Sequence, residues 1–464
     1  MRLESPSFAQ TASPIDLISS PPLTDPPTFT VHRRRMISSH SVPNIFQPLL
    51  ISPPSTEIIR HEQLRLESEY CPLLSSPSLS TLANSSSHSV VITITDATRP
   101  SPDRLLLHLI RKTLDEAGIK PEQITLLCAT GLHRPMSRDE AIDKFGEENL
   151  AGVEFVNHAA NDRDQLVEVG VVDSIPVVVN RRCVEADLLI ALGVVEPHQY
   201  AGFSGGAKGV VIGCGGEKTI QETHSIGMIG RSGTQLTAIQ GNPFQSFVRE
   251  GGKKVGLRYV LNVALNAEGE VVGSACGDPI EVHNYLAAKS LKICRVDLPE
   301  PASAALVGVP ESKGTNLYQA SRAATYLALA ERSPLRPGAP IIIPATIREG
   351  AGDGIGERHF FDLLSRVESP VALIREFEEK NSPAGGQRAY IVARTLLNHP
   401  IIVAGAEYPD VVRACHMIPA IDLDEGLNIA EDIVRQRFGN HQQTLLLIEN
   451  GLTTIPRLAE QRVG

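Results

Sequence analysis

The chain has 464 residues, which is enough for two or more domains with a sizeable hydrophobic core. Hydrophobic residues make up 42% and charged residues 21%, as in ordinary soluble globular proteins, and the net charge of -10 argues against a nucleic-acid-binding face. No apolar run approaches the roughly 18 residues that a membrane helix needs, and the N-terminus does not have the pattern of a secretory signal. The seven cysteines include no CxxC pair, which indicates neither a zinc site nor a disulfide framework. We therefore expect a cytoplasmic protein without nucleic-acid or membrane partners.

Residues 1–55 are rich in serine, proline and threonine. Such a segment cannot bury enough apolar surface to offset the entropy lost on ordering. We expect a disordered or extended N-terminal tail, or one that crosses to another subunit.

Residues 56–297 alternate β-branched runs with helical patterns. The run Val90–Asp96 ends at a proline-containing loop, a helix is expected over Arg104–Ala117, and Ile124–Thr130 repeats the plan before a helix at Arg138–Phe145. Strand, polar loop, helix and strand is the order typical of a parallel sheet.

The same domain continues to an apolar run at Asp187–Gly193, which is expected to be its central strand. Val177–Val179 continue the strand pattern before it, while Arg258–Ala264 and Glu270–Gly273 resemble a hairpin. We expect an N-terminal α/β cofactor-binding domain over 56–297.

Two prolines between Val296 and Pro301 are typical of a linker, and a second α/β domain is expected over 298–448. The C-terminal segment 449–464 is expected to return to the first domain. The predicted fold is therefore α/β, with two α/β domains, mainly parallel sheets and an active-site cleft between them. The predicted buried strands of the second domain are Ala304–Val309, Pro340–Pro344, Pro400–Ala404 and Thr444–Ile448.

The loop after the predicted central strand contains a lysine, Lys208, framed by Gly205, Gly206 and Gly209. A Walker A loop is excluded because Lys208 is not followed by Ser or Thr. A partly desolvated lysine has a lowered pKa and offers a nucleophilic amine that can form a covalent bond. Taken singly, glycine-rich turns are usually only turns, but this combination favours a functional site.

Polar side chains follow the first two predicted strands at the points where they end: Asp96 and Arg99 after one, His133 after the next. Parallel strands place their carboxyl ends on one side of a sheet, so these residues are expected to face the Lys208 loop, which also carries His198. The alternative is that they are strand-to-helix turns with incidental charges. Two histidines on separate loops suit an inversion of stereochemistry, in which one base removes a proton and the other returns one.

A second group of candidates opens a predicted helix at Asn316–Glu331. Gln319 and Arg322 share one face of it, and Arg99 and Arg322 are both suited to a carboxylate. A solvated helix charge is the alternative for Arg322.

In this order the motifs resemble the nickel-pincer-nucleotide-dependent lactate racemases and the related hydroxyacid racemases and epimerases. The resemblance runs from about residue 57 to the C-terminus. The matching residues are Asp96-Ala-Thr-Arg-Pro100, Gly131-Leu-His-Arg-Pro135, Glu196-Pro-His198, Ala201 to Lys208, His224 and Tyr318-Gln319.

The resemblance implies an isomerase whose cofactor is a pyridinium mononucleotide that holds nickel through sulfur, carbon and sulfur. It implies that His133 and His198 are the catalytic bases and that His224 is the nickel ligand. The cofactor-binding residues implied are Lys208 (through a thioamide), Asp96, Ser204, Gly205 and Gly206, and the substrate-binding residues are Arg99, Tyr318, Gln319 and Arg322.

The sequence departs from the lactate enzymes at Arg322, where those enzymes have lysine. Arginine and lysine are not equivalent at a carboxylate site, so a 2-hydroxyacid with a second carboxylate, such as malate, joins lactate as an expected substrate. An epimerase of a sugar or sugar acid and a non-catalytic carrier of the nickel nucleotide are the alternatives. The expected partners are the 2-hydroxyacid and proteins that synthesise and supply the cofactor, and the sequence leaves open whether the chain forms a homo-oligomer.

Overall fold

A computed structural model describes residues 42–60, 77–83, 89–97, 99, 101–379 and 386–460. Most of the predicted tail, residues 1–41, lies outside this range, as does Pro100 of the first strand-end motif. Within the described residues, no helix is both long and apolar enough to span a membrane.

The first six-stranded sheet confirms the predicted βαβ order. Its strands run in the spatial order β11, β10, β7, β2, β3 and β4, and all neighbours are parallel except the β10–β11 pair. Every residue of the central strands β2 and β7 is buried, as their continuous apolar runs predict. The strands are β2 (Val90–Ile94), β3 (Ile124–Cys128), β4 (Glu154–Asn157), β7 (Leu188–Val194), β10 (Tyr259–Leu265) and β11 (Val271–Gly277).

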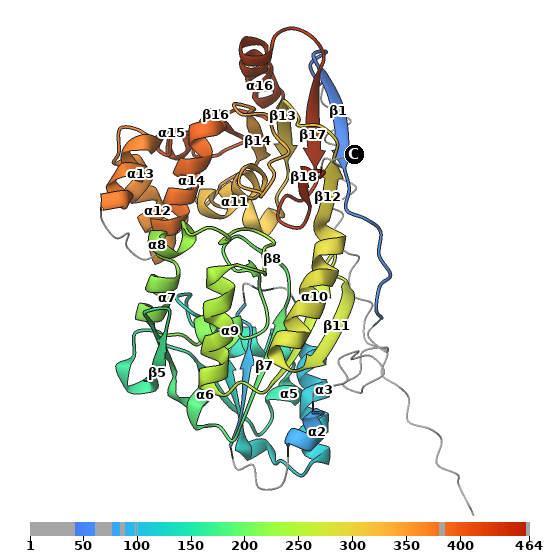
Figure 1. The fold of residues 1–464 in the computed structure, drawn as a ribbon, viewed down its shortest axis with the longest axis vertical. Coiled ribbons are helices and arrows are strands. Elements are labelled where there is room, and N and C mark those ends of the chain that lie inside the picture. Colours follow the sequence, from blue (N-terminus) through green and yellow to red (C-terminus); the bar gives the residue numbers. More distant parts are fainter. Residues whose placement is uncertain are drawn as a thin grey trace, which may run out of the picture. The chain divides into compact units, whose positions relative to one another are not determined.

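Helices connect these strands and cover the sheet. α4 begins at the predicted residue because Ser137 and Glu140 form a capping box around its first turn. Helix α10 lies along the β10–β11 hairpin (Figure 1). The helices of this part are α2 (Leu79–Leu82), α3 (Asp103–Glu116), α4 (Arg138–Phe145), α5 (Glu147–Leu150), α6 (Arg181–Glu185), α7 (Glu217–Thr223), α8 (Ile226–Ile229), α9 (Pro243–Val255) and α10 (Pro279–Cys294).

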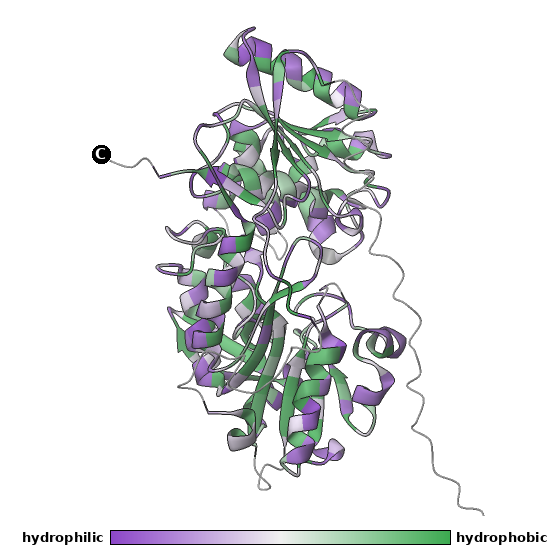
Figure 2. Cartoon of the chain, turned by 90° about the vertical axis from the view of Figure 1, so that its right-hand side faces the viewer, coloured by the Kyte–Doolittle hydropathy of each residue, from purple (hydrophilic) through white to green (hydrophobic). Residues whose placement is uncertain are grey.

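The second six-stranded sheet is parallel throughout, in the order β1, β17, β13, β14, β15 and β16. In both sheets the strands are the most hydrophobic segments, and the flanking helices carry mixed faces (Figure 2). The strands are β1 (Phe46–Ile51), β13 (Ala304–Val307), β14 (Ile341–Pro344), β15 (Ile401–Ala404), β16 (Ile418–Ala420) and β17 (Gln443–Ile448). The helices are α11 (Leu317–Ala328), α12 (Ile355–Ser365), α13 (Pro370–Glu379), α14 (Gly386–Asn398), α15 (Pro409–Ala414) and α16 (Leu423–Phe438).

Strand β1 differs from the expectation of a tail over residues 1–55. Six residues of that segment pair in register with β17, from Phe46 opposite Gln443 to Ile51 opposite Ile448. Pro48 is compatible with this position because β1 is an edge strand, where a missing N–H costs no ladder bond. The composition of residues 1–55 does not indicate this strand, because its partner β17 lies near the other end of the chain.

Three short strand pairs lie outside the two large sheets. β5 (Leu166–Val172) pairs with β6 (Ile175–Asn180), so Val177–Val179 belong to a hairpin and not to the parallel sheet in which the sequence pattern placed them. β8 (Pro197–His198) pairs with β9 (Gly202–Phe203) within the predicted active-site loop. β12 (Arg295–Leu298) pairs with β18 (Ile455–Leu458), which connects the predicted linker with the C-terminal segment. The predicted domain boundaries stay a prediction.

Candidate functional site

The first-sheet candidates all follow the carboxyl ends of adjacent parallel strands. Asp96 and Arg99 follow β2, His133 follows β3, and the loop with His198 and Lys208 follows β7. Because β2 pairs with both β3 and β7, the three loops leave the same edge of the sheet, which is where open α/β sheets bind ligands.

His133 is held by a carboxylate. Its Nδ1 lies 2.6 Å from Oδ2 of Asp96, whose side chain is buried while that of His133 is 54% exposed. With Asp96 ionised, Nδ1–H donates to the carboxylate and the lone pair of Nε2 stays available. Asp96 was expected to contact a cofactor, and here its contact is with the predicted base.

His198 is held in the opposite tautomer. Its Nδ1 accepts hydrogen bonds from the backbone N–H groups of Tyr200 (3.3 Å) and Ala201 (3.2 Å). Burial, reinforced by the nearby cations Lys208 and Arg99, holds the pKa of His198 well below its usual value. The ring is therefore neutral, and its proton resides on Nε2.

His224 ends helix α7 and is neutral as well. Its Nδ1 donates to the carbonyl oxygen of Ile220 at 2.9 Å, which leaves Nε2 with a free lone pair. The ring packs edge-on against Phe244, with 5.0 Å between centroids, and against Tyr200 at 5.8 Å. Burial, followed by the charge of Lys208, lowers the pKa of His224 to about 4. A neutral imidazole whose second nitrogen donates to a carbonyl is the usual state of a metal-ligating histidine.

Lys208 directly precedes a short π-helix, Gly209–Gly213, a distortion that is frequent at functional sites. The pKa of Lys208 is lowered to about 7, mainly by burial. The charge of Arg99 also lowers this pKa, and its effect is larger than the opposing effect of Glu196. Among the described residues, no carboxylate forms an ion pair with Lys208. Its amine is thus partly deprotonated near neutral pH, as a nucleophilic lysine requires.

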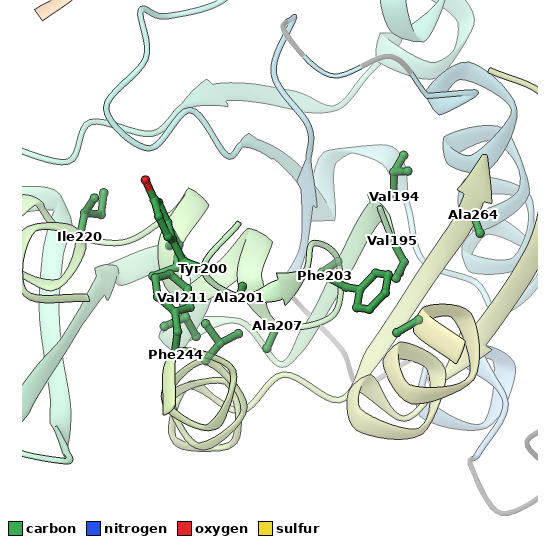
Figure 3. Packing of buried hydrophobic residues seen from close by; sticks show 14 of the residues in the cluster. Val194, Val195, Tyr200, Ala201, Phe203, Ala207, Val211, Ile220, Phe244 and Ala264 are labelled. Carbon is green, nitrogen blue, oxygen red and sulfur yellow. The ribbon is translucent and has the colours of Figure 1, made fainter. Parts of the chain in front are cut away.

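Apolar packing fixes the loop that carries these residues. Val195, Tyr200, Phe203 and Ala207 are buried, and Figure 3 shows Tyr200 and Ala201 near Val211 and Phe244. Gly202 has a φ of +74°, and a Cβ there would lie 1.7 Å from the backbone oxygen of Ala238. Only glycine fits at this position.

Hydrogen bonds within the protein hold the predicted cofactor-binding residues Ser204, Gly205 and Gly206. Ser204 Oγ donates to the carbonyl of Val194 at 2.7 Å and accepts from the N–H of Glu196 at 3.1 Å. The N–H of Gly206 donates to Oδ1 of Asn262 at 2.7 Å. These bonds are internal to the protein, so cofactor contacts of the three residues stay a prediction.

Arg99 and Glu196 form an ion pair of 3.0 Å between two half-buried side chains. The sequence assigned Arg99 to a substrate carboxylate without identifying this partner. The pair places both residues beside the His198 loop.

The second-sheet candidates lie on α11. Asn316 caps this helix by accepting a hydrogen bond from the N–H of Gln319 at 2.9 Å. One turn on, Arg322 donates from Nη2 to the hydroxyl of Tyr326 at 2.7 Å and from Nη1 to Oε1 of Gln319 at 3.4 Å. Tyr318 packs edge-on against Phe360, with 5.6 Å between ring centroids. Among the residues that the structure describes, Arg322 is thus held by its own helix and pairs with no carboxylate.

Sequence reasoning missed three residues near these candidates: Lys313, Gln199 and Arg388. Lys313 belongs to a 3-10 turn that reads as a polar surface loop, yet burial and then Arg322 and Arg99 lower its pKa to about 8. Gln199 adjoins His198, and Arg388 lies in α14. No local pattern indicates any of the three, because their environment is formed by distant segments.

Positive charge dominates the electrostatics of the site. The same two guanidinium groups, Arg99 and Arg322, lower the pKa of Lys208 and of Lys313, while Glu196 and Asp96 raise it. Two permanent guanidinium charges and two titrating lysines therefore face two carboxylates, which favours an anionic ligand. Within the described residues, no group of three or more His, Cys, Asp or Glu side chains could hold a metal ion.

Comparisons with known proteins match both halves of the chain to the same family. Residues 55–237 match the family model of the lactate racemase N-terminal domain, and residues 308–455 match that of the lactate racemase C-terminal domain. A lactate racemase of Lactiplantibacillus plantarum is 30% identical over 357 residues, which cover 74% of this chain and 80% of the relative. One from Thermoanaerobacterium thermosaccharolyticum is 30% identical over 377 residues, covering 79% of this chain and 84% of the relative.

Solved structures confirm the predicted α/β fold. The lactate racemase apoprotein from Thermoanaerobacterium thermosaccharolyticum superposes with a TM-score of 0.75 at 26% identity, covering 88% of this chain and 99% of that one. A protein from Thermotoga maritima shares the fold with a TM-score of 0.64 at 18% identity, covering 88% of this chain and 100% of that one.

Proposed function

Because the chain belongs to the lactate racemase family and is an isomerase, we propose that it racemises a small 2-hydroxyacid at C2. The observation that carries this proposal is the pair His133 and His198, held in opposite tautomers on loops that leave the same edge of one sheet. Inversion through a planar 2-keto acid needs one group that takes the hydroxyl proton and a second that gives a proton to the oxygen when the hydride returns on the other face.

His133 is suited to take the proton. Asp96 fixes the ring through Nδ1 and stabilises the imidazolium that forms when Nε2 gains a proton. His198 presents Nε2–H from a neutral ring, which can polarise an oxygen by donating a hydrogen bond. The two side chains therefore have complementary hydrogen-bonding roles before any proton moves.

The family resemblance implies a nickel-pincer nucleotide, and the residues present fit that group. His224 offers an unprotonated Nε2 from a neutral ring, and Lys208 offers an amine with a pKa of about 7. We propose that Lys208 attaches the nucleotide, that His224 ligates the nickel, and that Asp96, Ser204, Gly205 and Gly206 line its binding site. When bound, the group supplies an acceptor for the C2 hydride, which it later returns.

Substrate recognition is proposed to rest on Arg99, Tyr318, Gln319 and Arg322. The excess of cations at this site would bind a carboxylate, and the fork of Arg322 can hold one through two hydrogen bonds. Lys313 interacts with Arg322 and Arg99 and adds positive charge to the site, which favours binding of a second carboxylate. We therefore propose that malate is preferred over lactate.

The test is a chirally resolved assay of the nickel-loaded protein on single enantiomers of malate, lactate and a panel of other 2-hydroxyacids and sugar acids. We expect both enantiomers of malate to approach a racemic mixture, with a higher kcat/KM than for lactate. Conversion of a sugar acid alone would indicate an epimerase. Nickel-loaded protein that converts no substrate in the panel would support a carrier.

A further inference from the structure

Arg388 in α14 is a buried arginine that the proposed mechanism does not use. Its side chain is 6% exposed, and among the described residues it forms no ion pair with a carboxylate. Its Nη1 donates to Oε1 of Gln199 at 3.0 Å and to Oγ1 of Thr325 at 3.2 Å. A buried guanidinium is costly unless it is well hydrogen-bonded, so these contacts determine where it lies.

Each contact of Arg388 adjoins a residue of the proposed site. Gln199 directly follows His198 in the β8–β9 loop. Thr325 belongs to α11, where its hydroxyl donates to the carbonyl of Arg322 at 3.2 Å. The guanidinium also lies 5.6 Å from the ring centroid of Tyr318. One side chain thus connects the loop of the proposed proton donor with the helix of the proposed carboxylate-binding residue.

Other bonds of the same loop come from its own half of the chain. The carbonyl of Tyr200 accepts from Nδ2 of Asn242 at 2.8 Å, and that of Gly202 accepts from the N–H of Thr237 at 3.1 Å. Gln199 is buried, and within the described part of the chain its Nε2 has no hydrogen-bond partner. Its amide oxygen is therefore the group through which the loop is held from α11 and α14.

We propose that Arg388 is a positioning residue that fixes the His198 loop, Pro197–Phe203, against α11 through Gln199. The inference rests on the proposed function in one respect, that His198 acts on the substrate bound by Arg322. Its structural part, the ordering of the loop by Arg388, does not depend on the reaction.

The expected effect differs from that of a substrate-binding residue. Arg388→Met keeps an apolar side chain in the buried space but removes both hydrogen bonds of Nη1, so the loop should exchange its amide hydrogens faster and His198 should lose its alignment. Misplacement of a catalytic group by about 1 Å can cost on the order of a hundredfold in rate. We expect kcat to fall by roughly ten- to a hundredfold while KM changes little, whereas Arg322→Met should raise KM.

Arg336 provides a matched control. Its Nη1 donates to a glutamine oxygen, Oε1 of Gln443, at 3.3 Å and to the hydroxyl of Ser303 at 3.4 Å, and its guanidinium lies 4.0 Å from the ring centroid of Phe438. These contacts repeat those of Arg388 without touching a residue of the proposed site. Arg336→Met should therefore lower thermal stability without changing exchange in the His198 loop or kcat.

The experiment measures hydrogen–deuterium exchange of the peptide covering Pro197–Phe203, together with kcat and KM, in the full-length wild type, Arg388→Met and Arg336→Met. Gln199→Met removes the hydrogen bond between Gln199 and Arg388 without removing the charge of Arg388. This variant replaces Arg388→Met in the experiment if Arg388→Met fails to fold. Faster loop exchange in Arg388→Met or Gln199→Met but not in Arg336→Met, with a kcat-specific loss, is the expected result.

Unchanged loop exchange in a folded Arg388→Met or Gln199→Met would overturn the proposal, and so would a faster-exchanging loop with normal kcat. If the loop loosens but the wild type racemises no 2-hydroxyacid, the proposed function fails while the positioning of the loop by Arg388 stands.

Discussion

The strand-end loops of the first sheet and helix α11 of the second respond differently to burial. In the loops, burial makes His198 and His224 neutral and brings the pKa of Lys208 to about 7. On α11, burial lowers the pKa of Arg322, but Tyr326 and Glu196 more than offset it, so the pKa is raised from its usual value and the side chain stays cationic. Lysine and histidine can lose their protons near neutral pH, and arginine cannot. The loops are therefore suited to proton transfer and covalent chemistry, and the helix to holding a permanent charge.

The largest expected effect is on the loop side, at the proposed nickel ligand. His224→Ala should lose the metal and all racemase activity, because Nε2 of His224 is the proposed protein ligand. Metal analysis of the purified protein should find about one nickel ion per wild-type chain and almost none in the variant, with adventitious binding controlled by a competing divalent ion.

His399 is the matched control for this experiment. Its Nδ1 also contacts a backbone carbonyl, that of Ala339 at 2.9 Å, but it follows α14 in the second half of the chain. His399→Ala should keep its nickel. Equal nickel in His224→Ala and the wild type would remove His224 from the ligand set.

The next largest effect is expected at the two proposed catalytic histidines, His133 and His198. His133→Ala removes the proton acceptor proposed for one enantiomer, and loss of a general base usually lowers the rate by about a hundredfold or more. His198→Ala should also abolish net racemisation, because the oxygen on its side loses its donor. The measurement is the racemisation rate of each variant, started from each enantiomer in turn. A variant whose rate stays close to that of the wild type would show that its missing histidine has a purely structural role.

A smaller effect is expected on α11. Arg322→Lys replaces a planar guanidinium with a point charge and weakens the proposed charge-assisted contact with the substrate carboxylate. We expect a loss of about 1.5 to 3 kcal/mol in the free energy of that contact. This corresponds to roughly one to two decades in kcat/KM. We expect the ratio of malate to lactate turnover to fall in the variant. A wild type that prefers lactate, with a ratio unmoved by Arg322→Lys, would place specificity elsewhere.

The smallest effect is the pH dependence of Lys208 in protein without cofactor. Its pKa is lowered from 10.5 to about 7, so the reactive neutral amine is half-populated near pH 7 and increases as the pH rises. Limited acylation followed by peptide mass spectrometry should label Lys208 with a midpoint near that pH, and Lys313 about one unit higher. Labelling of Lys208 only above pH 9 would contradict the lowered pKa.

The sequence predicts local elements well when their signals are local. The capping residues of α4 and the continuous apolar run of β7 are readable in a single segment, and both elements were confirmed. Strand β1 was not predicted because its proline and serine context is typical of a tail, and its partner β17 is about four hundred residues away.

The candidate site follows the same rule. The strand-end positions of His133 and Lys208 can be inferred from the βαβ order, because parallel strands end at one edge. The Asp96–His133 contact, the Arg99–Glu196 ion pair and Arg388 beneath the His198 loop join distant segments, so no single stretch of sequence predicts them.

We propose that His133 handles the hydroxyl proton while the hydrogen on C2 moves as a hydride that never exchanges with solvent. The most direct measurement is racemisation of one malate enantiomer in D2O by nickel-loaded protein, with the product analysed by mass spectrometry and proton NMR. We expect the opposite enantiomer to retain protium at C2. Deuterium at C2 of the product would contradict it, because it would mean that a base removes the carbon-bound hydrogen as a proton.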